Sequence, residues 1–174
     1  MERGLEYNRV TPLIGVKLIG LLDDADPAVR AGAVRLLVGG RYTPADEALR
    51  RYAERHGGDD PRPARQARLY LQGRVVEEHL RRLDPDSMAV VTRAVVASRY
   101  GGTSLDYTVD GRGSLEERVN SFDPATTARI TAHLKRLDPS VFRIRPFRFR
   151  VSARLREQGD KESGVRLAVE DYPD

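Results

Sequence analysis

Apolar residues in the first 73 positions recur with the spacing of amphipathic α-helices. The first apolar stripe consists of Leu13, Val16, Leu18, Ile19 and Leu22. Asp26 before Pro27 begins the next helix, because aspartate caps free backbone N–H groups and proline fits the first helical position. Thr43-Pro44-Ala45-Asp46 begins another helix, with an acidic residue in its first turn. The pattern predicts an antiparallel helical subdomain over residues 1–73.

One seven-residue phrase occurs twice in the rest of the chain. It reads His-Leu-Arg-Arg-Leu-Asp-Pro at residues 79–85 and His-Leu-Lys-Arg-Leu-Asp-Pro at residues 133–139. Apolar residues before each copy form a helical face, and each Asp-Pro ends that helix. After both copies the pattern changes to the alternation typical of strands. The phrase therefore indicates a helix–β-hairpin unit that is present twice, over residues 74–110 and 128–172.

Alternation and turn residues predict the strands of these two units. In the first unit, residues 87–100 are expected to pair with 103–109 across a Gly-Gly turn. In the second, residues 142–155 are expected to pair with 165–169. A longer polar turn, at residues 159–164, joins this second pair of strands.

Residues 87–99 also fit a helix that begins at Asp84. We favour a strand there, because Pro146 prevents the equivalent segment of the second unit from being helical.

These elements define an α+β fold, with an α+β subdomain over residues 74–174 after the helical subdomain. A short helix is expected between the two helix–hairpin units, because Ser114-Leu115-Glu116-Glu117 has the sequence of a capping box. Asp123-Pro124 then begins the helix that carries the second copy of the phrase.

Residues 21–37, LLDDADPAVRAGAVRLL, resemble a HEAT-type helical repeat, in which D-P-x-V-R-x-x-A-x-x-L begins the second helix. Residues 60–71 repeat part of this pattern at an offset of 34 positions, with Pro63 in place of Val29. The resemblance implies stacked helix pairs that present a surface to protein partners. An ordinary helical bundle with good helix starts is the alternative.

Residues 114–137 and the long hairpin that follows them also resemble a winged-helix DNA-binding segment, in which a short helix precedes a recognition helix and two strands flank a basic wing. The predicted recognition helix is about one turn longer than in that family, and the turn before it lacks the usual small residue. The resemblance implies DNA binding by the second half of the chain.

Arginine and apolar residues alternate from Phe142 to Arg156, and the alternation shifts by one position at Pro146. Such a shift predicts a β-bulge that keeps the arginines on one face of the ribbon. Guanidinium groups bind phosphates through paired hydrogen bonds and release counterions. With two basic residues of the second phrase, they form the candidate nucleic-acid-binding set: Arg143, Arg145, Arg148, Arg150, Arg154, Arg156, Lys135 and Arg136. The alternative is a solvated strand face that pairs with acids such as Glu157, Glu162 or Glu170.

Composition excludes several classes of protein. The chain is 40% apolar and 32% charged, as soluble globular proteins are, and no apolar run is long enough to span a membrane. Its first residues, MERGLEYNRV, do not resemble a signal peptide, so a cytoplasmic location is expected. With no cysteine, disulfides, thiolate metal sites and cysteine nucleophiles are excluded.

The excess of arginine does not by itself indicate nucleic-acid binding, because a GC-rich genome also favours arginine codons. The net charge is +4, with 27 Arg against three Lys.

No set of residues in the sequence has the spacing of a catalytic or cofactor site. His79 and His133 occupy equivalent places and could approach each other, but two histidines do not hold zinc without further ligands. Neither a metal nor a cofactor is expected, and an enzyme is unsupported.

The sequence thus favours a non-catalytic binding protein that contacts nucleic acid through its arginine-rich ribbon. A protein–protein adaptor that acts through the HEAT-like helices is the alternative. Partner identity, oligomeric state and biological process are left open.

Overall fold

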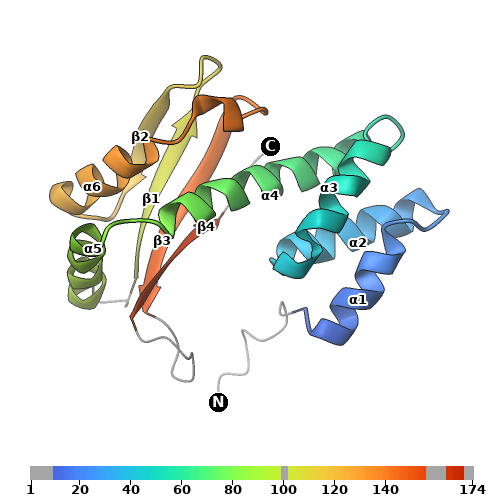
Figure 1. The fold of residues 1–174 in the computed structure, drawn as a ribbon, viewed down its shortest axis with the longest axis horizontal. Helices are drawn as coiled ribbons and strands as arrows, with labels where there is room; N and C mark the ends of the chain where they lie inside the picture. The colour runs from blue at the N-terminus through green and yellow to red at the C-terminus, as the bar shows by residue number, and fades with distance from the viewer. Residues whose placement is uncertain (1–9, 99–101, 156–163, 171–174) are drawn as a thin grey trace. The chain divides into compact units, whose positions relative to one another are not determined.

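The computed structural model describes residues 10–98, 102–155 and 164–170. The chain divides into two compact units, Met1–Leu71 and Gln72–Asp174. Helices occupy the first part of the chain and a four-stranded antiparallel sheet lies in the second, so the predicted α+β fold is confirmed (Figure 1). Helix α4 (Pro61–Leu80) is continuous through Gly73 and contributes residues to both units.

The first unit consists of α1 (Pro12–Leu21), α2 (Pro27–Gly39), the 3-10 turn η1 (Thr43–Ala45), α3 (Asp46–Arg55) and the first part of α4. The sequence-predicted helix starts are confirmed. At α2, the side chain of Asp26 accepts a hydrogen bond of 2.8 Å from the N–H of Ala28. A close approach occurs at Gly15, where an added Cβ would lie 2.3 Å from the ring of Tyr42, so any other residue there would have to displace that ring.

The second unit places two similar series of elements in one sheet. The first series is the end of α4, α5 (Pro85–Ala97), β1 (Gly102–Val109) and β2 (Leu115–Asn120). The second is α6 (Pro124–Leu134), the 3-10 turn η2 (Pro139–Val141), β3 (Phe147–Leu155) and β4 (Val165–Glu170). The strand order is β2-β1-β3-β4, with every neighbouring pair antiparallel. Each series therefore ends in a hairpin, and the first strands of the two hairpins are adjacent.

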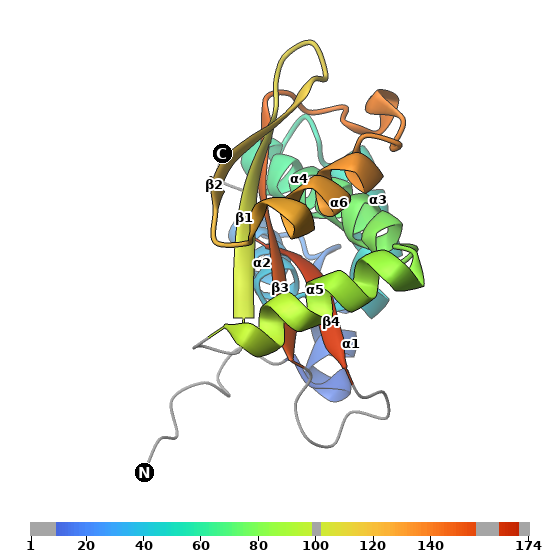
Figure 2. The same cartoon turned by 90° about the vertical axis from the view of Figure 1, so that its left-hand side faces the viewer.

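One face of this sheet forms the core of the second unit. Helices α5 and α6 lie against that face (Figure 2), which carries Tyr107, Phe147, Phe149 and Val151. The rings of Tyr107 and Phe149 stack with their centroids 5.3 Å apart, and Phe149 stacks on Phe147 at the same distance. The hydroxyl groups of Tyr107 and Thr131 are 2.8 Å apart, which ties the sheet to α6.

The prediction of a strand over residues 87–100 is wrong, because Pro85–Ala97 form helix α5. Residues 99–100 lie outside the described residues. Asp84 accepts a hydrogen bond of 2.8 Å from the N–H of Ser87, and Val91 and Val95 are fully buried. The Asp-Pro helix start and one apolar helical face thus outweigh the strand propensity of the valines. The alternative helix that begins at Asp84 is the correct interpretation.

The short helix expected after Ser114 is also wrong, because residues 115–120 form strand β2. The carboxylate of Asp110 accepts hydrogen bonds from the N–H groups of Arg112 and Ser114, at 2.9 and 2.8 Å. These bonds close the turn between β1 and β2, so the capping-box residues continue a hairpin instead of beginning a helix.

The β-bulge expected at Pro146 is absent from the described strand β3. Residues 142–146 are irregular, the Arg145–Pro146 peptide bond is cis, and β3 begins at Phe147. Its pairing with β1 is regular from Phe147 to Arg154. The alternation therefore shifts at Pro146 because the preceding residues lie outside the strand. The hairpin of β3 and β4 is confirmed, although most of its polar turn lies outside the described residues.

Polar side chains of α4 hold the backbone of other segments in the second unit. The amide of Gln72 donates to the carbonyl of Ile144 at 3.1 Å and accepts from its N–H at 3.0 Å, as a neighbouring strand would. The carboxylate of Glu77, 1% exposed, accepts from the N–H of Val169 in edge strand β4 at 3.0 Å and from Arg74 at 2.5 Å. Helix α4 thereby satisfies backbone groups that the sheet itself leaves unpaired.

Replacing Glu77 with alanine is expected to lower the free energy of unfolding by about 3–5 kcal/mol. The change removes the buried carboxylate that neutralises Arg74 and accepts the N–H of Val169. The control is E78A, which removes a neighbouring carboxylate that is 52% exposed and is expected to cost less than about 0.5 kcal/mol. Urea unfolding followed by circular dichroism measures both, and equal losses would contradict this role of Glu77.

Candidate functional site

The arginines predicted to bind nucleic acid do not form one continuous row. Arg148, Arg150 and Arg154 lie at alternate positions of β3, on the sheet face opposite the aromatic core. We call this side of the sheet the outer face. Arg143 and Arg145 lie in the irregular segment before β3, and Arg156 lies outside the described residues.

Several of these arginines are held by neighbouring groups. Arg150 forms a bidentate ion pair with the carboxylate of Asp106 on β1, with hydrogen bonds of 2.7 and 3.2 Å. Arg154 lies 3.4 Å from the carboxylate of Glu170 on β4. Arg145 donates to the carbonyl oxygens of Phe142 and Pro139, at 2.7 and 2.5 Å, and so fixes the chain before the cis bond. Acids of the same sheet thus partly neutralise the strand arginines.

Four of the predicted residues are exposed without an ion pair among the described residues: Arg143, Arg148, Lys135 and Arg136. Lys135 and Arg136 follow helix α6 in the second copy of the repeated phrase. These four side chains are available to an anionic ligand.

The repeated phrase itself joins the two series of elements. His79 and His133, each in the last turn of its helix, stack with ring centroids 4.3 Å apart. The Nε2 of each ring lies 2.8 Å from the backbone carbonyl of the other residue, so each Nε2 carries a proton and donates it. The predicted approach of the two histidines is confirmed. Both rings are already engaged with backbone carbonyls, and their role is to hold two helix ends together.

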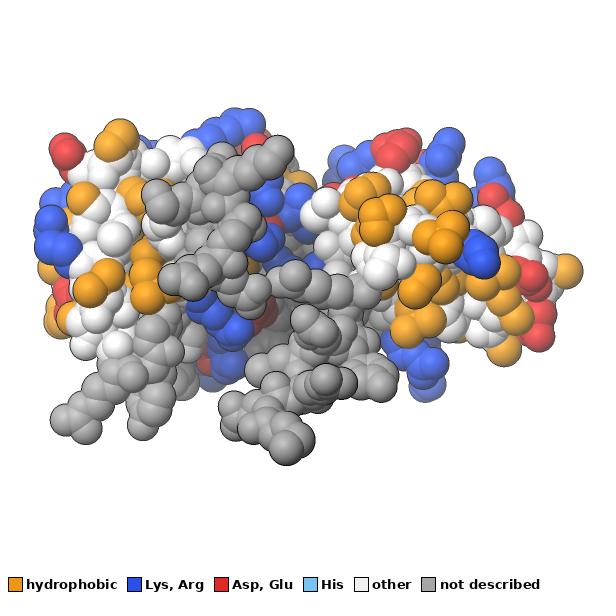
Figure 3. Space-filling model, turned by 90° about the horizontal axis from the view of Figure 1, so that it is seen from below, with side chains coloured by type: hydrophobic (Ala, Val, Ile, Leu, Met, Phe, Trp, Pro, Cys, Tyr) orange, Lys and Arg blue, Asp and Glu red, His pale blue; other side chains and the backbone are white. Residues whose placement is uncertain are grey.

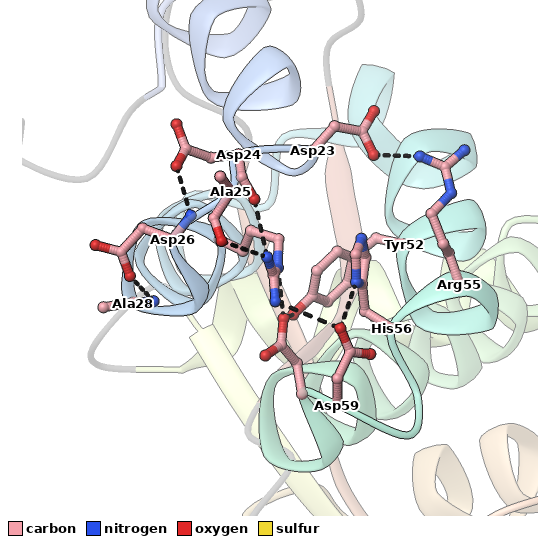
Figure 4. A network of polar contacts seen from close by, with 11 residues as sticks. Asp23, Asp24, Ala25, Asp26, Ala28, Tyr52, Arg55, His56 and Asp59 are labelled. Carbon is pink, nitrogen blue, oxygen red and sulfur yellow. Dashed lines mark hydrogen bonds and ion pairs between the residues drawn. The ribbon is translucent and has the colours of Figure 1, made fainter.

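A buried ion-pair network in the first unit was not anticipated (Figure 4). The side chain of Arg30 on α2 is 7% exposed, and its Nε donates to the carboxylate of Asp60 at 2.7 Å. Its Nη1 donates to the carbonyl oxygens of Asp24 and Ala25, at 2.9 and 3.2 Å. Tyr52 donates to the same oxygen of Asp60, at 3.0 Å. The network fixes α2 to α3 and to the start of α4.

The same network contains the donor atoms of a possible metal centre. Ligand atoms of His56, Asp59 and Asp60 lie within 4.8 Å of one another. However, Arg30 contacts both carboxylates, and its hydrogen bond holds the pKa of Asp60 below the ordinary value. Burial and the hydrogen bond to Asp60 raise the pKa of Tyr52 to about 12. The Arg30 guanidinium thus already compensates the charge of both carboxylates, which favours a structural role for this cluster.

Helix α1 exposes an apolar side with a single charged residue. The exposed fractions are 71% for Leu13, 49% for Ile14, 66% for Val16 and 38% for Leu21. At the helical period these four residues share one side with Lys17 and Gly20, which are also exposed. We call this side the α1 apolar face. Leu36 on α2, the helix that packs on α1, is 53% exposed as well. Figure 3 shows orange side chains gathered on the surface of this unit.

Comparison with known proteins gives no relative: no family model matches the chain, and no curated protein or solved structure matches it significantly. Among the described helices, none combines the length and the apolar character that crossing a membrane requires.

Replacing Asp60 with asparagine is expected to remove part of the acid sensitivity of the first unit. The pKa of Asp60 is lowered in the fold, so its ionisation stabilises the fold above about pH 3.9, the ordinary aspartate value. That contribution is lost as the pH falls through the lowered pKa. Thermal midpoints between pH 7 and pH 2.5 test this. D60N should melt lower than the wild type at pH 7 and change less below pH 4. The control is E54Q at an exposed position, which should follow the wild type, and a D60N profile parallel to the wild type would contradict the assignment.

Proposed function

We propose that the protein is a non-catalytic adaptor that binds another protein through the α1 apolar face. The exposure of Leu13, Ile14, Val16 and Leu21 on one side of a single helix carries this proposal. A helix that is apolar on all sides is normally buried, and contiguous exposed apolar side chains mark interaction surfaces. The expected HEAT-like character of these helices supports the same function, because such helices stack on further helices.

The chemistry of the face indicates the kind of partner. Lys17 is the one charge on this side of α1, and it lies between Leu13 and Leu21 at helical spacing. An amphipathic helix that places an apolar stripe on the leucines and a carboxylate near Lys17 would match it. We therefore expect a helical partner with an acid at the edge of its apolar stripe.

The V16E variant is expected to abolish partner binding without unfolding the protein, since Val16 is 66% exposed and a buried glutamate in the interface would be unpaired. A photo-crosslinking residue at Leu13 should give one discrete adduct in cells, which V16E removes. The control is R51E, a charge reversal at an exposed position of α3, which should retain the adduct. An adduct that persists in V16E, or a failure to form one with the wild-type face, would contradict the proposal.

Nucleic-acid binding is the second candidate function. The side chains of Arg143, Arg148, Lys135 and Arg136 support it, because they are exposed and make no ion pair with the described residues. Binding through them would rest on phosphate contacts, since the outer-face positions of β1 and β3 carry no aromatic residue on which a base could stack.

Replacing Arg148 with alanine is expected to lower the slope of log K against log salt for a DNA duplex by about 1. The R150A variant should change the slope less, because Asp106 already neutralises Arg150. Fluorescence anisotropy at several salt concentrations measures both slopes. Absence of binding at low salt, or equal slopes for both variants, would contradict this second function.

A further inference from the structure

Two arginines stand directly opposite each other on the outer face of the sheet. Arg154 of β3 is the register partner of Arg166 of β4, and both are exposed. Like charges at directly opposed positions of an antiparallel pair repel each other. Arg154 has Glu170 as a partner, whereas Arg166 makes no ion pair with the described residues. The charge of Arg166 is therefore not compensated by any described acid. A pair of guanidinium groups in this arrangement is favourable when an anion lies between them.

A buried hydroxyl group lies next to this arginine pair. Ser152 precedes Arg154 on the same face of β3 and stands opposite Ala168. It is 3% exposed, and its hydroxyl has no hydrogen-bond partner among the residues that the structure describes. A buried hydroxyl without a partner is costly, and such groups in native proteins often mark a ligand site.

The contact of Arg154 with Glu170 places the Arg154 side chain across the row of residues that contains Ser152. Glu170 stands opposite Arg150, so the row of Ser152 and Ala168 separates it from Arg154. To lie 3.4 Å from Glu170, the side chain of Arg154 must extend across that row. The Arg154 side chain is 69% exposed, and such surface pairs are weak. An anion can therefore compete with Glu170 for this arginine.

We propose that Arg154, Arg166 and Ser152 form a site for a phosphate group. Arg154 leaves Glu170 and both guanidinium groups donate to the phosphate oxygens, while the hydroxyl of Ser152 donates a further hydrogen bond. Glu170 holds the site closed when no anion is bound. The site lies in the second unit and goes beyond the adaptor function, which rests on helix α1. A phosphate monoester and a nucleic-acid backbone share this chemistry.

Thermal unfolding in inorganic phosphate, against chloride at equal ionic strength, tests the site. Phosphate should raise the midpoint of the wild type, because it binds the folded protein alone. R166A should unfold no lower than the wild type in chloride, since it relieves the repulsion, and it should lose the rise in phosphate. The control is R93A, an exposed arginine of helix α5 outside the predicted binding residues, which should keep the rise. An equal rise in R166A and R93A would overturn the proposal.

Two further variants separate the roles of the neighbouring residues. In calorimetric titrations with inorganic phosphate, E170Q should bind a few-fold more tightly, because Arg154 no longer has a competing carboxylate. S152A should bind about tenfold more weakly, since a hydrogen bond to a charged group is lost. Its midpoint in chloride should be no lower than that of the wild type, because the change removes a buried hydroxyl without a partner. If E170Q weakens binding, or S152A leaves it unchanged, the assigned geometry is wrong.

A DNA duplex at the same phosphate concentration identifies the source of the phosphate group. If R166A weakens the binding of inorganic phosphate and of DNA equally, the site belongs to a nucleic-acid surface. If R166A weakens the binding of inorganic phosphate alone, the site binds small phosphate esters. Because V16E changes only the α1 apolar face, its result and that of R166A are independent.

Discussion

The buried carboxylate of Glu77 is the constraint around which the second unit is built. Strand β4 is one edge of the sheet, and the buried N–H of Val169 on this strand donates a hydrogen bond to the Glu77 carboxylate. Arg74 neutralises that carboxylate. The same helix holds Ile144 through Gln72, which stands in for a strand where the chain before the cis proline is irregular. One helix thus completes the hydrogen bonding of two segments that the sheet cannot satisfy.

The repeated phrase has the same structural role in both series of elements, because its two histidines contact each other reciprocally. Each ring donates to the carbonyl of the other copy, so the contact is complete only when both copies are present. Each carbonyl also accepts the N–H of the residue three positions later, from Arg82 at 3.0 Å and from Arg136 at 3.1 Å, so the histidine of the other copy is a second donor to it. Beyond the phrase the copies diverge: one continues into the full helix α5, the other into the single turn η2. The first copy is therefore followed by a helix that covers the sheet, whereas the second is followed by a short turn and the irregular segment before β3.

Local signals in the sequence predicted much of this fold, and contacts between distant residues account for the rest. Asp26 and Asp123 cap helices as expected, because a cap involves only the next few residues. Segment 87–100 was misassigned because its valines suit a strand and a buried helix equally, and only packing against the sheet decides. The pairing of Arg30 with Asp60 spans 30 positions, and no local pattern marks it. Sequence placed the arginines of β3 on one face, but their acid partners on β1 and β4 depend on strand order.

The outer face separates arginines that serve the fold from arginines that remain for a ligand. Asp106 binds Arg150 with both oxygens in a register position directly across from it, which is the geometry of a structural pair. Arg154 instead reaches an acid two rows away and stands opposite a like charge. A pairing chosen for stability would put an acid at position 166, where an arginine stands. Stability alone therefore does not account for Arg166, and its charge near the buried hydroxyl of Ser152 supports the phosphate site proposed for this face.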